Sequence, residues 1–151
     1  MFEHAFCGLA MGFDIVQISQ IQSSLAIFGV AFKERLFTHV ELSYACCDAS
    51  LCAERLAARF AAKEAVIKAL QLSEVGVDWR NIEVIKKPDG DCCLQLHGDV
   101  AGFALSMGVT QWLLSMSHDG DYAGAVVMAL GFTPHRKISE LSIKVKNVGI
   151  H

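Results

Sequence analysis

Hydrophobic residues recur at helical spacing through the middle of this chain. No Gly or Pro interrupts the run from Arg55 to Leu72, which is rich in the strong helix formers Ala, Leu, Lys, Glu and Arg. Apolar side chains recur along it one to two turns apart, at Leu56, Phe60, Ile67 and Leu70. The pattern predicts a long central helix over about residues 51–72.

Shorter patterns on both sides of this helix predict a mixture of strands and helices. Helical patterns cover residues 18–28 and 98–107, and Thr38 and Glu41 have the spacing of a capping box. The stretch 44–50 fits neither type of element. Strand patterns cover residues 13–16, 81–87, 92–96, 111–118 and 122–130. The turn signals Pro88-Asp89-Gly90-Asp91 and Asp119-Gly120-Asp121 join neighbouring strands as hairpins, which predicts an α+β fold of antiparallel strands packed on the long central helix.

The length of 151 residues and a hydrophobic fraction of 53% suit a single domain with a substantial core. We predict an N-terminal extension over residues 1–10, a folded domain over 11–130 and a basic C-terminal tail over 131–151. The tail has four basic residues and one acidic residue, so it carries +3 of a total charge of −3. The remaining −6 on the body argues against binding to nucleic acid.

Neither a membrane span nor a secretory signal is expected. The longest apolar run, Tyr122 to Phe132, is shorter than the ~20 residues that cross a bilayer. Glu3 stands near the start, without a basic cluster ahead of an apolar stretch. We therefore expect a cytoplasmic protein. The six cysteines include two adjacent pairs and lack common zinc-site spacing, so we expect them to act as small apolar residues.

Charged residues on the central helix are candidates for chemistry. Glu64 and Lys68 are four residues apart and project from one face, and Arg59 and Lys63 form a second such row. Asp14 stands alone among apolar residues, where a charge is costly unless it meets a cation. The plainer alternatives are a surface ion pair for Glu64 and Lys68, a solvated helix position for Lys63 and a helix N-cap for Asp14.

Three segments, read together, resemble one family. They are "GFDIVQI" from Gly12, "RFAAKEAVIKAL" from Arg59 and "SMSHD" from Ser115. The connecting pieces "RLFTHVEL", "DWRNIEVI" and "LHGDVAGFA" follow in the same order. This pattern resembles the holo-acyl-carrier-protein synthase family of 4′-phosphopantetheinyl transferases over residues 12–130.

The resemblance implies transfer of the phosphopantetheine arm of coenzyme A to a serine of an apo acyl-carrier protein, with release of 3′,5′-ADP, for fatty-acid biosynthesis. It implies that Asp14 and Glu64 hold Mg²⁺, with Mn²⁺ as the alternative, and that Lys68 meets the phosphates. The general base is left open between Glu64 and a water on the metal. The residues implied to bind the coenzyme are Arg59, Lys63, Lys68, Ser117 and His118.

The implied partners are an acyl-carrier protein, or a carrier domain of a fatty-acid synthase, and two further copies of the chain in a homotrimer with active sites between protomers. Two departures from the family stand out. The first helix carries no charge from Gln17 to Ser24, where relatives often have basic residues that meet the carrier. In addition, Leu70 to Ser73 replaces a stretch in which the family usually has Gly, which predicts a longer or reshaped helix end. The first departure keeps open an alternative, a coenzyme-binding scaffold protein without transferase activity.

Overall fold

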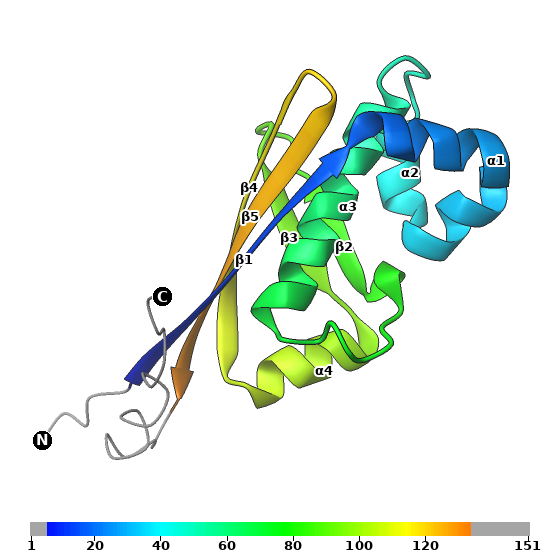
Figure 1. Cartoon of the computed structure of the whole chain (residues 1–151). Coiled ribbons are helices and arrows are strands. Elements are labelled where there is room, and N and C mark those ends of the chain that lie inside the picture. The colour runs from blue at the N-terminus through cyan, green and yellow to red at the C-terminus, as the bar shows by residue number, and fades with distance from the viewer. Residues whose placement is uncertain (1–5, 134–151) are drawn as a thin grey trace, which may run out of the picture.

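The computed structural model describes residues 6–133, which form a three-stranded sheet, a separate hairpin and four α-helices (Figure 1). The sheet consists of β1 (Phe6–Gln17), β5 (Tyr122–Thr133) and β4 (Val109–Asp119) in that order, and β5 pairs antiparallel with both neighbours. The hairpin consists of β2 (Ile82–Lys86) and β3 (Cys92–Leu96). The predicted α+β class with antiparallel pairing is confirmed.

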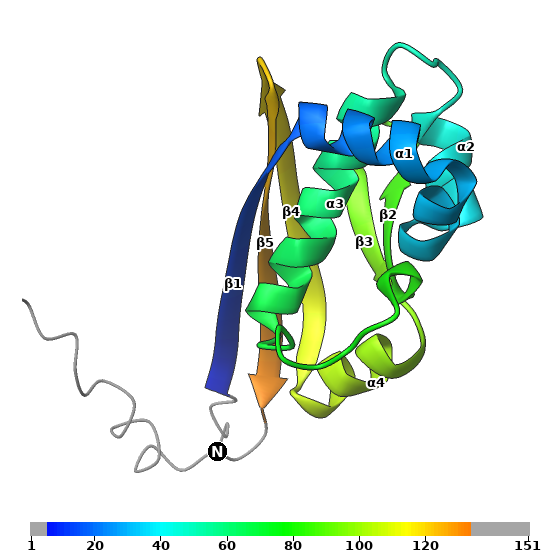
Figure 2. The same ribbon diagram turned by 45° about the vertical axis from the view of Figure 1, so that its right-hand side comes forward.

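The central helix α3 (Cys52–Ala69) packs along one face of the three-stranded sheet, and the hairpin covers a further side of it (Figures 1 and 2). Twelve of its 18 residues are buried, which is more than a single apolar stripe provides. Six of the twelve are alanines, whose small side chains let neighbouring strands approach the helix axis closely. The helix therefore lies at the centre of the core.

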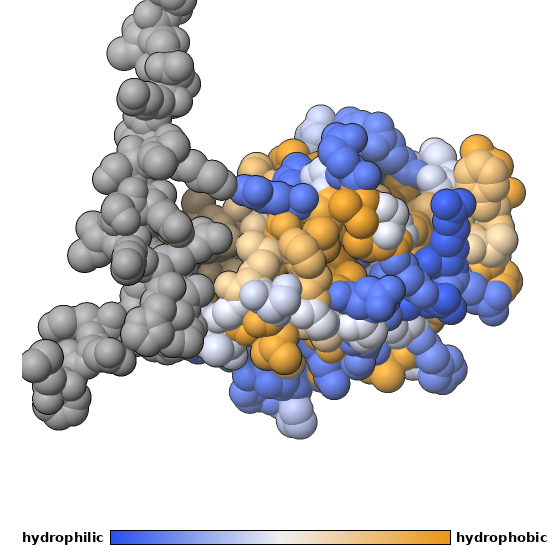
Figure 3. All heavy atoms as spheres, turned by 90° about the horizontal axis from the view of Figure 1, so that it is seen from below, coloured by the Kyte–Doolittle hydropathy of each residue, from blue (hydrophilic) through white to orange (hydrophobic). Residues whose placement is uncertain are grey.

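The other helices close the two ends of the molecule (Figure 1). At one end lie α1 (Ile18–Leu36) and α2 (His39–Ala45), and the predicted capping box forms at Thr38 and Glu41. At the opposite end lies α4 (Gly98–Ser106), preceded by a short 3₁₀ turn and the β2–β3 hairpin. Figure 3 views this second end, where apolar and polar residues both reach the surface. No helix within residues 6–133 is long and apolar enough to span a membrane.

The folded domain extends beyond the predicted range of residues 11–130 at both ends. β1 begins at Phe6, so residues 6–10 belong to the sheet and not to an extension, and β5 continues through Thr133 into the predicted tail. The two strands pair along their whole length, from Phe6 with Thr133 to Gln17 with Tyr122. This mutual pairing is a tertiary effect that neither segment signals alone. The remainder of both predicted segments, residues 1–5 and 134–151, lies outside the described residues.

The ends of two helices also differ from expectation. α1 continues past residue 28 to Leu36 because Gly29, at φ 55° and ψ −127°, breaks the helix only locally. α3 is not lengthened, since it ends at Ala69 with Leu70 as its C-cap. Gln71 follows at φ 57°, and Leu72 N–H donates to the Ile67 carbonyl, the bond of a Schellman motif. Gln71 thus occupies the left-handed position that Gly usually takes.

Replacing Gly12 with Ala is expected to destabilise the protein, because β1 touches the backbone of α3 at this residue. A Cβ on Gly12 would lie 1.8 Å from the Ala65 carbonyl oxygen and 2.7 Å from its carbon, so the strand must move away. We expect a loss of about 1–3 kcal/mol in the free energy of unfolding, measured by denaturant titration. Gly102→Ala is the matched control, because nothing lies within 4 Å of its added Cβ. Equal stability of the two variants would contradict the close contact.

Candidate active site

Asp14 and Lys68 meet although 54 residues separate them. Lys68 Nζ, on the last turn of α3, donates to Asp14 Oδ1 at 2.7 Å and to the Phe13 carbonyl oxygen at 3.1 Å. The Asp14 side chain is 16% exposed and the Lys68 side chain 48%, so the carboxylate is mostly buried and the ammonium can be reached from solvent. Asp14 is inside β1, and the N-cap position of α1 belongs to Gln17. The N-cap alternative for Asp14 is therefore wrong.

Glu64 lies one helical turn before Lys68 and interacts with the same aspartate. Partial burial raises the pKa of Glu64, the nearby Asp14 carboxylate raises it further, and Lys68 partly offsets both effects. Two carboxylates that repel each other across a partly buried site provide a favourable place for a divalent cation. Within residues 6–133 no cluster of three or more His, Cys, Asp or Glu side chains is placed to hold a metal. A two-carboxylate site suits Mg²⁺, which keeps several waters and takes substrate phosphate oxygens as its other ligands.

A pocket of about 510 Å³ opens between the first half of α3, the turn of the β2–β3 hairpin and the end of β4. Arg59 contributes a guanidinium to it that is almost completely buried, with the residue 3% exposed. Its Nη1 donates to the Arg55 carbonyl oxygen at 3.1 Å, whereas Nε and Nη2 have no hydrogen-bond partner among the described residues. Burial lowers the pKa of Arg59. Buried N–H donors that lack acceptors make this pocket a candidate site for an anionic ligand.

Three cations surround one aromatic ring on the wall of this pocket. The guanidinium carbons of Arg59 and Arg55 lie 4.7 Å and 4.9 Å from the centre of the Tyr44 ring, and Lys86 Nζ lies 6.0 Å from it. All four residues line the pocket. Sequence reasoning found Arg59 but missed the other three. The sequence does contain a signal for Arg55, because Arg55 precedes Arg59 by four residues and so lies on the same helical row.

Ser117 and His118 lie at the rim, near the end of β4. His118 Nε2 is 3.3 Å from Glu54 Oε1 on α3, and the His118 side chain is 54% exposed. Both residues line the cationic pocket and also a second, smaller hollow on the outer face of the sheet, which includes Phe13 and Ile15. The structure thus brings Arg59, Ser117 and His118 together in one place.

Lys63 does not belong to this group. Its side chain is completely buried, and Nζ binds Glu41 Oε2 at 2.8 Å and the carbonyl oxygens of Trp79 and Ile82. All three ammonium hydrogens therefore have acceptors within the core. Neither the coenzyme-binding role nor the solvated alternative fits this position, because each requires Lys63 to face solvent or a pocket.

Comparison with known proteins agrees with this arrangement. A sequence model of the 4′-phosphopantetheinyl transferase superfamily matches residues 10–127. The chain belongs to that superfamily. Among individual relatives, a holo-[acyl-carrier-protein] synthase of Dehalococcoides mccartyi is 42% identical over 124 residues, covering 80% of this chain and 98% of the relative. One of Salinispora arenicola is 41% identical over 121 residues and covers 80% of this chain and 97% of the relative. The family resemblance seen in the sequence is confirmed.

Solved members of the superfamily share the fold. The ACPS–CoA complex of Chronobacterium ammoniagenes superposes with a TM-score of 0.72 at 34% identity, covering 84% of this chain and 99% of that one. The holo-[acyl-carrier-protein] synthase of Helicobacter pylori, in complex with coenzyme A, gives a TM-score of 0.68 at 29% identity, covering 79% and 98% of the two chains. The predicted 4′-phosphopantetheinyl transferase-like fold is therefore confirmed.

Asp14, Glu64 and Lys68 form a carboxylate cluster on one side of α3, and the cationic pocket around Arg59 lies on its other side. Asp14 is in the edge strand β1, and the pocket lies at the other edge strand, β4. Asp14 is opposite Ala125 of β5, which in turn is opposite Met116 of β4. Two strand spacings put them about 10 Å apart. On this face of the sheet α3 packs between them. Asp14 and Glu64 do not line the pocket.

Proposed function

We propose that this protein transfers 4′-phosphopantetheine from coenzyme A to a serine of an apo acyl-carrier protein and releases 3′,5′-ADP. The observation that carries the proposal is the meeting of Asp14, Glu64 and Lys68 on a chain of this superfamily. The unsatisfied donors of Arg59 add a second site for phosphate, which a coenzyme with several phosphates can use. Phosphoryl transfer depends mainly on such positioning and charge neutralisation.

Each residue of the cluster has a proposed task. Asp14 and Glu64 would hold Mg²⁺, or Mn²⁺, which when bound neutralises charge on the pyrophosphate. Lys68 now pairs with Asp14, and its exposed ammonium can turn to a phosphate oxygen and stabilise the leaving group. Glu64, whose pKa is raised by partial burial and by the nearby Asp14 carboxylate, is proposed to accept the proton of the attacking serine.

The cationic pocket is proposed to bind the nucleotide end of the coenzyme. Arg59 offers the N–H groups of Nε and Nη2 from a buried position, and Ser117 and His118 lie at the rim. The guanidinium is already ordered by Tyr44 and by the Arg55 carbonyl, so binding a phosphate costs little side-chain entropy.

A homotrimer with sites between protomers would unite the two halves of the site. The outer face of the sheet supports self-association, because it carries a row of exposed apolar side chains on β1. Leu9 is 61% exposed, Met11 64%, Phe13 56% and Ile15 57%. Such a contiguous apolar strand is costly in water and is typical of a subunit interface. A neighbouring copy on this face would reach the hollow beside Ser117 and His118.

The carrier is the less defined partner. α1 carries no acidic residue in its first turn and has basic residues only in its last turn, at Lys33 and Arg35. Ile27, Phe28 and Val30 are exposed around the Gly29 break. We propose that docking to α1 relies on apolar contact more than on charge. This favours a carrier domain embedded in a synthase, where effective concentration offsets weak steering.

The test is the intact mass of an apo carrier protein after incubation with this protein, coenzyme A and Mg²⁺, with free-standing and synthase-embedded carriers compared. We expect the mass to rise by one phosphopantetheine and the gain to disappear when EDTA removes the metal. Coenzyme binding without any mass gain on either carrier would replace the proposal by the coenzyme-binding scaffold, which is supported only by the lack of charge from Gln17 to Ser24. Efficient, steeply salt-dependent modification of an acidic free-standing carrier would contradict the apolar docking.

A further inference from the structure

A disulfide bond joins Cys46 and Cys52 at the corner between α2 and α3. Cys46 is the C-cap of α2 and Cys52 is the first residue of α3, so the bond fixes how the two helices meet. This corrects the expectation that all cysteines act as small apolar residues. Cys47, Cys92 and Cys93 carry free thiols.

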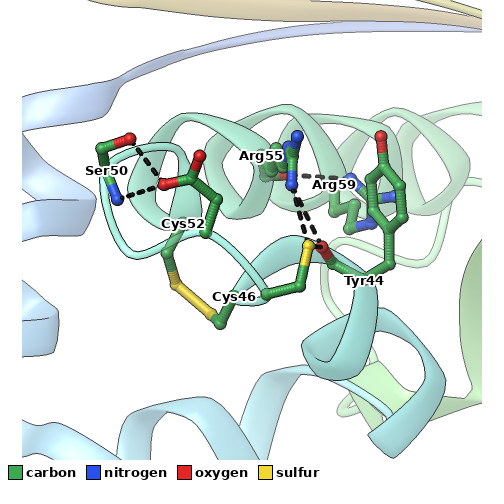
Figure 4. Close-up of a disulfide and its surroundings, with 8 residues drawn as sticks. Tyr44, Cys46, Ser50, Cys52, Arg55 and Arg59 are labelled. Carbon is green, nitrogen blue, oxygen red and sulfur yellow. Dashed lines mark hydrogen bonds between the residues drawn. A yellow bond between two sulfur atoms is a disulfide. The ribbon is translucent and has the colours of Figure 1, made fainter.

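The disulfide closes the loop over residues 46–52, which borders the cationic pocket. Tyr44 lies two residues before Cys46 and Leu51 directly before Cys52, and both line the pocket. Figure 4 shows the disulfide at the start of α3. Tyr44 of α2 lies beside Arg55 and Arg59 of α3. The Tyr44 carbonyl oxygen accepts from Arg55 Nη1 at 3.2 Å, while its ring lies over both guanidinium groups. Any change that frees this corner therefore reaches the phosphate-binding arginines through Tyr44.

We propose that Cys46 and Cys52 are a reversible oxidation site whose disulfide state increases the affinity of the cationic pocket for its phosphorylated ligand. The bond holds Tyr44 against α3, so in the oxidised protein the ring and both arginines are ordered before the ligand arrives. Reduction removes the covalent link between the two helices, and Tyr44 is then held against α3 by noncovalent contacts alone. Ligand binding must then order the Tyr44 side chain, and this loss of conformational entropy weakens the affinity. Ordering one such side chain corresponds to about a two- to ten-fold difference in dissociation constant.

The chemistry needs only a low-molecular-weight disulfide as oxidant. The thiolate of one cysteine attacks that disulfide and displaces one thiol, and the second cysteine then attacks the mixed disulfide and displaces the other. The two protein thiols lose two protons and two electrons, and the reagent becomes two thiols. Cys46 is partly exposed whereas Cys52 is 8% exposed, so Cys46 is the sulfur that reagents reach first.

The experiment compares one preparation in two states. The full-length protein is oxidised with oxidised glutathione or reduced with dithiothreitol, the reagent is removed, and binding of 3′,5′-ADP is measured by calorimetry under anaerobic conditions. Intact mass assigns the state, since the disulfide form is lighter by two hydrogen atoms and a mixed disulfide is heavier by a glutathione. We expect the dissociation constant to rise about two- to ten-fold on reduction. The variant C46S/C52S should bind like the reduced protein and ignore both reagents, and Cys93→Ser, which keeps the disulfide, should respond like the wild type.

Equal affinity in the two states, tighter binding after reduction, or failure of oxidised glutathione to form the bond would each overturn the inference. If C46S/C52S fails to fold, the comparison of oxidised and reduced wild type still decides the matter. The choice of 3′,5′-ADP as ligand rests on the proposed function, and a parallel transfer assay separates the two. Transfer with a redox-independent KM for coenzyme A would remove the inference and leave the function intact. A redox-dependent affinity for 3′,5′-ADP without any transfer would support the inference and contradict the proposed function.

Discussion

Glu64→Gln is expected to abolish phosphopantetheine transfer while the protein remains fully folded. The substitution keeps the size of the side chain and removes the carboxylate charge that we propose holds the metal. Loss of such preorganised charge stabilisation lowers turnover by about a hundred- to a thousand-fold. The measurement is the rate of mass gain of an apo carrier protein, with circular dichroism as the check on folding. Glu74→Gln is the matched control, because Glu74 is exposed and follows the helix.

The stability of the same variant gives an independent check. The folded-state pKa of Glu64 lies above the ordinary value of 4.5, so between these two values the folded protein binds more protons than the unfolded chain. The contribution of Glu64 to stability therefore falls as the pH rises above 4.5. In metal-free buffer at neutral pH we expect the Gln variant to melt at the same temperature as the wild type or higher. Mg²⁺ should raise the melting temperature of the wild type only.

A folded Glu64→Gln variant that still turns over, or that is stabilised by Mg²⁺ as much as the wild type, would remove Glu64 from the mechanism. An unfolded variant would contradict the inference that charge repulsion with Asp14 is present in the metal-free protein.

The sequence could predict the carboxylate cluster because each member has a local signal. Glu64 and Lys68 share a face of a helix whose pattern is clear, and Asp14 is a single charge in an apolar strand. Their meeting still depends on β1 packing on α3, and Gly12 permits that contact. The motif order identified the family and hence the packing, although spacing alone left the ion-pair and N-cap alternatives open.

The role of Lys63 could not be predicted from its helix, because its partners come from elsewhere. Helical spacing places Lys63 on the same row as Arg59, but burial is decided by what covers each position. Glu41 on α2 and two carbonyl groups around the start of β2 surround the Lys63 ammonium. Arg59, also buried, instead keeps two donors without protein partners at the pocket. Two basic residues on one helical row thus differ in role: Lys63 stabilises the core, and Arg59 lines the pocket.

Lys63→Met is expected to cause a large loss of stability, because it removes one partner of a completely buried ion pair. Met fills the volume but leaves the Glu41 carboxylate, which is completely buried, without its cation. Glu41 would keep only the N–H bonds from Thr38 and Val84, and the Trp79 and Ile82 carbonyls would lose a donor. Breaking a buried pair in this way costs about 3–5 kcal/mol. For a domain of this size that corresponds to a drop in melting temperature of roughly 10 °C.

Two further variants separate the buried pair from a general effect of removing a lysine. Lys87→Met breaks an exposed ion pair with Asp89, which water screens, and should leave the melting temperature nearly unchanged. The double variant Glu41→Gln/Lys63→Met removes both charges and should recover part of the loss. At a temperature where Lys63→Met is folded, its KM for coenzyme A should equal that of the wild type. A KM increase in a variant of unchanged stability would instead place Lys63 at the coenzyme and refute its role in the core.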